Sequence, residues 1–445
     1  MGSWRKALVC GLGASGVAAA TLLRKEGVDV VGVDERDTPE SRKSAEALSS
    51  QGCAVALGSD TPPAGEFDVA IASPGLRGDA PFLSGIRRRG IPTISELELG
   101  WSRFRGRSIA VTGSNGKSSV VKALAECFAA AGLRAIPCGN YGLPACRAVL
   151  DDSAADWLVI EASSFQLETC ADFRPDVGVL LNVLPNHLDR HGTLDAYAGL
   201  KARLFSRQRN GDVALVPTEW RERFREESGG GGRWKTFGTD PGADFIYFSG
   251  RISEKGGRGI DLSASYFGND VLGPNAAALY GAARAAGLAP KTVEETLRRF
   301  EPLPHRAEPI GEFGGVRYVN DSKATNLSAM IASIRMQDRP VWLVAGGRPK
   351  ETDFSPAVPI LRARVRGAFL IGEASAAMAS AWGAAVACES CGTLDRAVEA
   401  ARRAARPGET VLLSPACTSY DQFRAFGERG DAFRKIVRKI AWEKD

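Results

Sequence analysis

The stretch Thr112–Ser119, with the sequence TGSNGKSS, has the residue types and the spacing that could bind a phosphate. Its glycines let backbone amides approach an anion, and the start of a following helix adds partial positive charge. Lys117 can reach terminal phosphates, and Ser118 stands where the hydroxyl of a P-loop binds Mg²⁺. The strict P-loop pattern requires glycine at position 111, where this chain has valine. We therefore interpret the stretch as a variant P-loop.

The neighbouring segments decide between a phosphate site and a glycine-rich turn that only caps a helix. A short apolar strand is expected over Ser108–Val111, and a helix is expected over Val120–Ala131. The order of strand, loop and helix is the one that a P-loop needs. This order favours the phosphate site.

Two further residues could do chemistry at the ends of buried strands. Glu161 ends an expected strand over Trp157–Ile160, where a carboxylate suits Mg²⁺ binding or the positioning of water. The alternative is an acid in the first turn of a helix. His187 follows an expected strand over Val177–Leu181 and could be a metal ligand or a base, although a structural histidine is the alternative.

Lys201 occupies an unusual position for a lysine. Thr193 can cap the helix that follows it, and Lys201 then falls on the same face as the apolar residues of that helix. A buried lysine is costly unless it is paired or chemically changed, so the usual outcome is that its amine reaches the surface. The alternative is a neutral amine that reacts with CO₂, and the resulting carbamate would offer oxygen ligands to a hard cation.

The beginning of the chain contains a second nucleotide pattern. The glycine-rich run Gly11–Gly16 follows an expected strand over Lys6–Cys10, and a second strand, Val28–Val33, ends at Asp34. This spacing is typical of a nucleotide-binding βαβ unit and allows an NAD-dependent dehydrogenase as an alternative. That alternative leaves the P-loop and Glu161 unexplained.

Composition sets wider limits. The 445 residues are enough for about three domains. The net charge is +5 and the basic residues are scattered, so we expect no nucleic-acid partner. No run approaches the ~20 apolar residues of a membrane span, so we expect no membrane insertion. The nine cysteines lack metal-binding spacing and indicate free thiols in a reducing cytoplasm.

The alternation of expected strands and helices predicts an α/β protein of three domains. Residues 1–99 would form a Rossmann-like N-terminal domain, and residues 100–302 a central P-loop ATPase-like domain with a parallel sheet. Residues 303–445 would form a Rossmann-like C-terminal domain. A proline-rich junction over Glu301–Arg306 separates the second block from the third.

Together these motifs resemble the ATP-dependent Mur ligases of peptidoglycan synthesis over nearly the full chain. The P-loop, Glu161, His187 and Lys201 match the family's phosphate loop, carboxylate, metal-binding histidine and carbamylated lysine. Within this family, the chain is most similar to the branch that adds D-glutamate. The similarity lies in three runs: Ser163–Glu168, Asn320–Asn326 and Leu413–Phe423.

The resemblance implies an amide-bond ligase that works through an acyl phosphate. ATP would phosphorylate the carboxylate of UDP-N-acetylmuramoyl-L-alanine (UDP-MurNAc-L-Ala), and the amine of D-glutamate would then displace phosphate. It further implies two Mg²⁺ sites, a CO₂-derived carbamate on Lys201, small-molecule partners only, and a cytoplasmic monomer.

The resemblance also implies roles for single residues. The catalytic residues would be Lys117, Glu161, His187, Lys201 and Lys323. Ser118 and Glu161 would hold the first Mg²⁺, and His187 and the carbamate on Lys201 the second. ATP would be bound by Gly113, Ser114, Asn115, Gly116, Lys117, Ser118, Ser119, Asn275, Arg306 and Asp321. The UDP-linked substrate would be bound by Leu12, Glu35, Arg36, Gly75 and Asn140. The amino acid would be bound by Thr325, Lys350, Ser419 and Phe426.

Two segments depart from the family pattern. Gly273–Ala278 lacks one histidine and one asparagine of the adenine-side motif. In Gly346–Phe354, Pro349 replaces a usual aspartate and Glu351 a usual glycine. Because this second segment faces the amino-acid pocket in the family, L-glutamate or another acidic amino acid stays open as the substrate.

Three other readings remain as alternatives. Another Mur ligase or a folylpolyglutamate synthetase is disfavoured by Ser163–Glu168 and by Ser414–Cys417. A catalytically inactive binding protein is disfavoured by the complete set of candidate catalytic residues.

Overall fold

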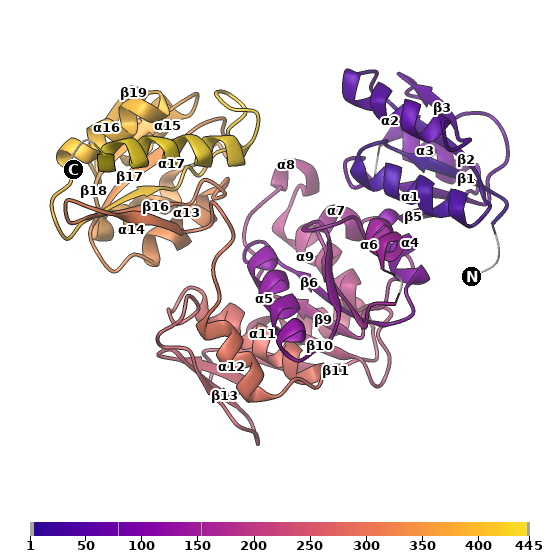
Figure 1. Ribbon diagram of the computed structural model, residues 1–445, viewed down its shortest axis with the longest axis horizontal. Coiled ribbons are helices and arrows are strands. Elements are labelled where there is room, and N and C mark those ends of the chain that lie inside the picture. Colours follow the sequence, from indigo (N-terminus) through magenta and orange to yellow (C-terminus); the bar gives the residue numbers. More distant parts are fainter. Residues whose placement is uncertain (1–3, 79, 153, 443–445) are drawn as a thin grey trace. The chain divides into compact units, whose positions relative to one another are not determined.

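The computed structural model describes residues 4–78, 80–152 and 154–442. In this part of the chain, helices surround three separate β-sheets that are mostly parallel (Figure 1). The expected α/β class with three sheet-containing regions is therefore confirmed.

The first sheet has five parallel strands in the order β3-β2-β1-β4-β5. The chain leaves β1 in one direction toward β2 and β3, and returns on its other side with β4 and β5. Such a reversal of strand order creates a crevice outside the carboxyl ends of the strands, where α/β proteins bind ligands. The elements of this region are β1 (Lys6–Cys10), α1 (Ala14–Lys25), β2 (Asp29–Asp34), α2 (Pro39–Ser49), β3 (Ala54–Leu57), β4 (Val69–Ala72), α3 (Pro81–Arg88) and β5 (Thr93–Ser95).

The second sheet has nine strands in the order β14-β13-β12-β11-β10-β9-β6-β8-β7, and the pairs from β7 to β12 are parallel. Strand β6, which carries the P-loop, lies between β8 and β9 in the interior of this sheet. The strands are β6 (Arg107–Thr112), β7 (Ala135–Gly139), β8 (Trp157–Glu161), β9 (Val177–Leu180), β10 (Val213–Pro217), β11 (Arg233–Gly238), β12 (Phe245–Phe248), β13 (Arg251–Glu254) and β14 (Ile260–Asp261). The helices are α4 (Glu96–Arg103), α5 (Lys117–Ala130), α6 (Ala145–Asp151), α7 (Ser164–Leu167), α9 (Leu194–Ala202), α10 (Arg221–Ser228), α11 (Gly273–Ala285) and α12 (Pro290–Arg298).

The third sheet has six strands in the order β15-β16-β20-β17-β18-β19, and only β15 is antiparallel to its neighbour. The loops that follow β16, β20 and β17 therefore lie side by side at one edge. The strands are β15 (Glu308–Phe313), β16 (Val316–Asn320), β17 (Val341–Gly346), β18 (Val365–Ile371), β19 (Cys388–Gly392) and β20 (Thr410–Leu413). The helices are α13 (Leu327–Arg335), α14 (Val358–Arg364), α15 (Ser375–Trp382), α16 (Leu394–Ala404) and α17 (Phe426–Trp442).

The chain packs into two compact units. The first unit comprises Met1–Val183, Thr193–Gly268 and Leu272–Arg299, and the second comprises Leu184–Gly192, Asn269–Val271 and Phe300–Asp445. The expected domain boundaries at residues 99 and 302 stay predictions.

No helix within the described residues has the length and the apolar character needed to cross a membrane. None of the nine cysteines forms a disulfide, and all nine lie in the described part of the chain.

Candidate active site

The P-loop connects β6 to α5, as the sequence predicted. Gly113 and Gly116 have φ values of 151° and 89°, and α5 begins immediately after Gly116. A Cβ atom on Gly116 would lie 2.5 Å from the Nδ2 atom of Asn275, so this position accepts only glycine. The same close approach places Asn275, at the start of α11, against the loop.

Lys117 folds back over its own loop. Its Nζ atom donates to the carbonyl oxygens of Gly113 at 2.7 Å and Ser114 at 3.0 Å. The first amides of a helix have no acceptors within the helix and attract anions. The ammonium group of Lys117 and the start of α5 thus both place positive charge at the P-loop.

Asn182 holds the first half of the loop, and sequence reasoning did not identify it. Its Oδ1 atom accepts the amides of Ser114 at 3.1 Å and Asn115 at 2.9 Å, and its Nδ2 atom donates to the Asn115 carbonyl at 3.1 Å. The only sequence signal was a polar residue just after β9, at the strand end beside β6. Asn182 therefore fixes the shape of the loop.

Glu161 contacts this loop through Ser118. It ends β8, pairs in register with Val111 of β6 and is 2% exposed. Its Oε2 atom accepts from the Ser118 hydroxyl at 2.6 Å, and its Oε1 atom accepts from the Asn140 amide at 2.6 Å. A hydroxyl and a carboxylate oxygen at this distance are a donor set that fits Mg²⁺.

Lys201 is buried, with 1% of its surface exposed, so its amine does not reach solvent. Thr193 caps α9 as predicted, with its hydroxyl accepting the Ala196 amide at 3.1 Å. The Nζ atom of Lys201 lies 3.1 Å from the Gly113 carbonyl and 4.2 Å from the ring centroid of Tyr197. Burial, and next the charge of Lys117, hold the pKa of Lys201 well below its ordinary value. A neutral amine in this position is the nucleophile that carbamate formation requires.

Within the described residues, no group of three or more His, Cys, Asp or Glu side chains could hold a metal ion. The predicted metal ligands, Ser118, Glu161, His187 and a modified Lys201, stay predictions. The carbamate itself is not tested by the structure.

His187 precedes the short helix α8 (Leu188–His191) and has a φ of 56°. Its carbonyl accepts the amides of Arg190 and His191. The residue belongs to the second compact unit, whereas Glu161 and Lys201 belong to the first. Its role as a ligand of the second Mg²⁺ stays a prediction.

The crevice of the first sheet is organised by Asp34. Its Oδ2 atom accepts the Leu12 amide at 2.7 Å, and its Oδ1 atom accepts the Arg36 amide at 3.0 Å. The carboxylate that would bind a ribose in a dehydrogenase therefore joins two loops of the protein instead. Glu35, Arg36 and Gly75 are exposed around this crevice, whereas Leu12 is buried and offers a ligand only its backbone.

Most of the remaining predicted residues follow strands of the third sheet. Asp321, after β16, accepts the Ala307 amide at 3.0 Å and the Ser414 hydroxyl at 3.3 Å, and burial raises its pKa to about 6. Arg306 lies between His305 and Ala307, which both have positive φ values.

Lys323 and Phe426 lie together, with the lysine Nζ atom 3.8 Å from the centroid of the phenylalanine ring. Thr325 donates its amide to the carbonyl of Lys323 at 2.8 Å. Ser419, after β20, is buried, and Lys350, after β17, is exposed. The three adjacent strand ends thus carry the whole predicted amino-acid site except Phe426, which starts α17.

The unusual Glu351 has a structural explanation. Its Oε2 atom accepts the amide of Leu327, the first residue of α13, at 3.0 Å, and burial raises its pKa. The side chain thus joins the loop after β17 to the start of a helix. Cys417 is fully buried and its thiol pKa is raised to about 12, which agrees with packing and not with a nucleophile.

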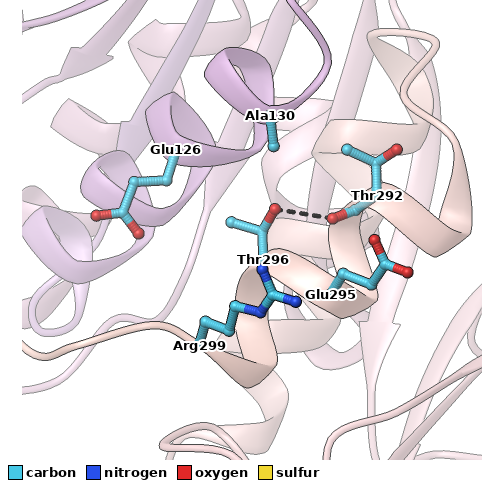
Figure 2. Close-up of a pocket in the computed structure, with 6 residues that line it drawn as sticks. All are labelled: Glu126, Ala130, Thr292, Glu295, Thr296 and Arg299. Carbon is cyan, nitrogen blue, oxygen red and sulfur yellow. Dashed lines mark hydrogen bonds between the residues drawn. The ribbon is translucent and has the colours of Figure 1, made fainter.

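A pocket of about 300 Å³ lies away from the P-loop, between α5 and α12 (Figure 2). Its α5 residues, Glu126 and Ala130, are in the second half of that helix, roughly 14 Å or more along the axis from Lys117. The pocket is therefore separate from the phosphate site. Its lining residues are Glu126, Ala130, Thr292, Glu295, Thr296 and Arg299.

Three family descriptions match successive parts of the chain. Residues 5–95 match the Mur ligase MurD-like N-terminal domain, residues 111–271 the Mur ligase middle domain, and residues 305–417 the glutamate ligase domain of Mur ligases. Together they cover most of the chain.

Relatives of nearly the same length are each named UDP-N-acetylmuramoylalanine–D-glutamate ligase. The protein from Acidobacterium capsulatum is 36% identical and aligns over 97% of this chain and 96% of its own. That from Pelotomaculum thermopropionicum is 37% identical, over 98% of both chains. That from Nitratidesulfovibrio vulgaris is 38% identical, over 98% of this chain and 96% of its own.

Solved structures share the fold at low identity. The MurF ligase of Thermotoga maritima in complex with ADP has a TM-score of 0.64 at 17% identity, over 93% of this chain and 96% of its own. A UDP-N-acetylmuramate–alanine ligase from the same organism has a TM-score of 0.58 at 15% identity, over 99% and 100%. Escherichia coli FolC in complex with DHPP and ADP has a TM-score of 0.56 at 16% identity, over 83% and 100%.

Proposed function

Because the chain belongs to the Mur ligase family, we propose that it is an ATP-dependent ligase that joins D-glutamate to UDP-MurNAc-L-Ala in peptidoglycan precursor synthesis. The observation that carries this proposal is the convergence of Lys117, Glu161 and the buried Lys201 on one phosphate loop. The choice of substrates is supported by relatives 36–38% identical over nearly the whole chain.

The chemistry follows from the weakness of a carboxylate as an electrophile. Transfer of the γ-phosphoryl group of ATP to the carboxylate of the L-alanyl residue creates an acyl phosphate, which has a good leaving group. The amine of D-glutamate attacks the acyl carbon, and phosphate leaves from the tetrahedral intermediate as the amide forms. Catalysis is then mainly positioning and neutralisation of charge.

The P-loop residues Gly113–Ser119 would cradle the ATP phosphates, with Lys117 neutralising the β- and γ-phosphates. Ser118 and Glu161 would hold the first Mg²⁺, and His187 and a carbamate on Lys201 the second. When bound, these ions would neutralise the charge of the phosphoryl oxygens. The hydrogen bond from Asn140 would orient Glu161 for this role, and Asn140 would also bind the UDP-linked substrate.

The other binding roles are assigned by region. Asn275, Arg306 and Asp321 would contact ATP, and Lys323 the transferred phosphate. Residues 1–99 would bind the UDP-linked substrate through Leu12, Glu35, Arg36 and Gly75, residues 100–302 would bind ATP, and residues 303–445 would bind the amino acid through Thr325, Lys350, Ser419 and Phe426.

The free cysteines support a reducing compartment, and we place the enzyme in the cytoplasm as a monomer.

The test is phosphate release in the presence of ATP, Mg²⁺ and UDP-MurNAc-L-Ala, with amino acids of both hands scanned as the second substrate. The expected result is rapid release with D-glutamate and little with neutral amino acids. Preference for L-glutamate would overturn only the stereochemical part, which Pro349 and Glu351 make worth testing. Equal use of neutral amino acids would overturn the acidic pocket.

A further inference from the structure

Arg429 is a buried cation that the proposed chemistry does not use. It lies in the first turn of α17 and is 1% exposed. Burial lowers its pKa only to about 10, so the guanidinium remains charged at neutral pH. Arginine is seldom fully buried without partners. The hydrogen bonds that it makes all go to neutral oxygens, and the charge of Asp421 acts on it without a hydrogen bond.

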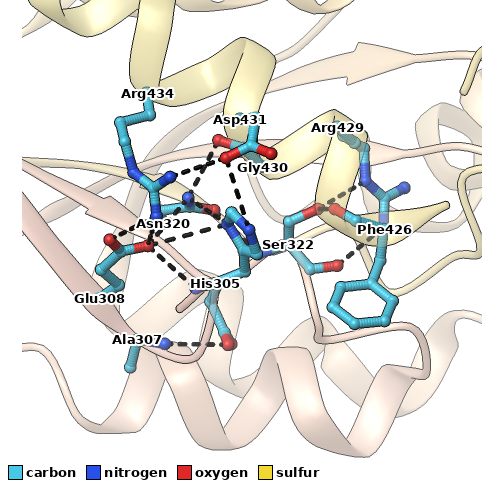
Figure 3. Close-up of polar contacts among 11 residues, drawn as sticks. His305, Ala307, Glu308, Asn320, Ser322, Phe426, Arg429, Gly430, Asp431 and Arg434 are labelled. Carbon is cyan, nitrogen blue, oxygen red and sulfur yellow. Dashed lines mark hydrogen bonds and ion pairs between the residues drawn. The ribbon is translucent and has the colours of Figure 1, made fainter. Parts of the chain in front are cut away.

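These hydrogen bonds reach three separate segments of the chain. The Nε and Nη2 atoms donate to the hydroxyl and the carbonyl of Ser322, at 3.0 and 2.9 Å. The Nη2 atom also donates to the Cys417 carbonyl at 3.0 Å. The Nη1 atom donates to the carbonyls of Thr418 at 3.2 Å and Gly346 at 3.4 Å. Figure 3 shows the guanidinium of Arg429 turned toward Ser322 and Phe426.

The three segments follow β16, β20 and β17, which are neighbours in the third sheet. The carbonyls of Ser322 and Cys417 lie beyond the paired part of the strands and need partners from elsewhere. Gly346 is the last paired residue of β17, and the Thr418 carbonyl also accepts the Arg348 amide at 3.0 Å. The packing here is tight, since a Cβ atom on Gly347 would lie 2.2 Å from the Thr418 carbonyl and 3.0 Å from the Nη1 atom of Arg429.

Each segment leads to a residue of the proposed amino-acid site. The loop that contains Ser322 continues to Thr325, Thr418 precedes Ser419, and Gly346 opens the loop that carries Lys350. The hydroxyl of Ser322 also donates to the carbonyl of Phe426 at 2.8 Å. One side chain therefore connects all the elements from which that site is built.

We propose that Arg429 is a positioning residue, which holds the three loops in the register that lets their side chains bind the acidic amino acid. It contacts no substrate itself. The inference rests on the proposed function, because that function makes these loops the amino-acid site. The planar guanidinium, with five donors in a fixed fork, can serve four carbonyls and a hydroxyl at once, whereas the ammonium group of lysine cannot.

The test compares Arg429→Lys, Arg429→Ala and Ser322→Ala with a matched control, Arg434→Ala. Arg434 lies on the same helix and pairs with Glu308 at 2.7 Å and Asp431 at 2.7 Å, and not with the loop oxygens that Arg429 binds (Figure 3). We expect Arg429→Lys to raise the KM for D-glutamate by about tenfold or more while the KM for ATP changes little, since misplacement by about an ångström has effects of this size. Ser322→Ala should also raise the KM for D-glutamate, by a smaller factor, with little change in the KM for ATP. Arg434→Ala should lower thermal stability and leave the KM for D-glutamate unchanged.

Hydrogen–deuterium exchange of residues 346–351 and 414–420 gives a second readout without any substrate. We expect faster exchange in Arg429→Lys than in wild type or Arg434→Ala. The proposal is overturned if Arg429→Lys folds with an unchanged KM for D-glutamate and unchanged exchange. It is also overturned if neither Arg429 variant folds and Ser322→Ala has wild-type kinetics, because Arg429 then serves stability alone. Failure of the wild type to use any acidic amino acid would refute the proposed function. The exchange comparison would still show whether Arg429 restrains the three loops.

Discussion

Lys117 is the side chain on which phosphoryl transfer would depend most directly. We expect Lys117→Ala to lose ligation by a factor of hundreds or more, because its charge matters most as negative charge moves in the transition state. Initial rates of phosphate release measure this loss. Lys122→Ala is the matched control, since Lys122 lies on the same helix and pairs with Glu126 at 2.6 Å. Its activity should stay close to wild type. Activity of Lys117→Ala within about tenfold of wild type would contradict the assignment.

Lys201 is the residue whose chemical state can be measured most directly. Since its amine is buried and its pKa is lowered, we expect a carbamate in the active enzyme. Lys201→Ala should be nearly inactive and partly restored by a short carboxylic acid that supplies the missing oxygens. Carbon-13 NMR under labelled CO₂ would detect the carbamate. A free amine in fully active enzyme would contradict this prediction.

Single residues also show where sequence reasoning ends. Lys117 could be proposed because the glycines that shape its loop are its near neighbours in the chain, and Glu161 because it ends an apolar strand. Asn182 could not, because the amides that it holds are 67 and 68 positions away. Arg429 could not, because it joins residues that lie between 11 and 107 positions away. Asp34 was considered as a ribose ligand, and only the fold shows that it joins two backbone loops.

At the scale of elements, the sequence predicts the positions of the strands closely, but it predicts the first and last residues of the elements less accurately. The apolar patterns of the sequence predict strands over Val177–Leu181 and Thr410–Leu413, and the observed strands are Val177–Leu180 and Thr410–Leu413. Helix α5 begins at Lys117 and not at Val120, because the left-handed Gly116 starts the helix before the apolar pattern appears.

The apolar run of the sequence predicts a strand over Ala368–Ile371, whereas strand β18 begins three residues earlier, at Val365. Its early part contains Arg366 and Gly367, which interrupt the apolar run although the backbone pairing continues. A Cβ atom on Gly367 would lie 2.6 Å from the ring of Trp342, so this glycine makes room for a side chain of the neighbouring strand. Such a requirement cannot be seen in the local sequence.

The start of α4 contains a buried acid whose ionisation should lower the stability of the fold. Glu96 is 1% exposed, its Oε1 atom accepts the Cys146 amide at 2.7 Å, and its Oε2 atom has no hydrogen-bond partner among the described residues. Burial raises its pKa from 4.5 to about 7. The pKa of this carboxyl is higher in the folded protein than in the unfolded chain. Its contribution to the free energy of unfolding is therefore fully present at low pH and is lost as the pH rises from about 4.5 to 7.

Glu96→Gln keeps an acceptor for the Cys146 amide and removes the charge. We expect the variant to be more stable than wild type at pH 8, by at most about 3 kcal/mol, and no more stable at pH 4. Thermal unfolding of both proteins at the two pH values measures the difference. An advantage that does not grow with pH would show that Glu96 carries no such cost.

At the scale of the whole molecule, a dinucleotide-like sheet and a P-loop sheet occur in one chain, and each alone would suggest a different enzyme. The first sheet has the strand order and the glycine-rich turn of a dinucleotide-binding domain. Yet both oxygens of Asp34 hold backbone amides, whereas Arg36 is exposed and can meet the charge of a diphosphate. We therefore expect this sheet to bind the UDP-linked substrate and not a nicotinamide.

Calorimetric titration of the full chain with UDP-MurNAc-L-Ala and, separately, with NADH tests this expectation. The UDP-linked substrate should bind and NADH should not. Arg36→Ala should weaken the binding of the UDP-linked substrate by about tenfold, as expected for loss of one charge-assisted contact, and leave ATP binding unchanged, because ATP would bind at the P-loop. Arg42→Ala is the control, since Arg42 pairs with Asp37 at 2.6 Å nearby on the surface. Tight binding of NADH without binding of UDP-MurNAc-L-Ala would make the first sheet a dehydrogenase domain after all.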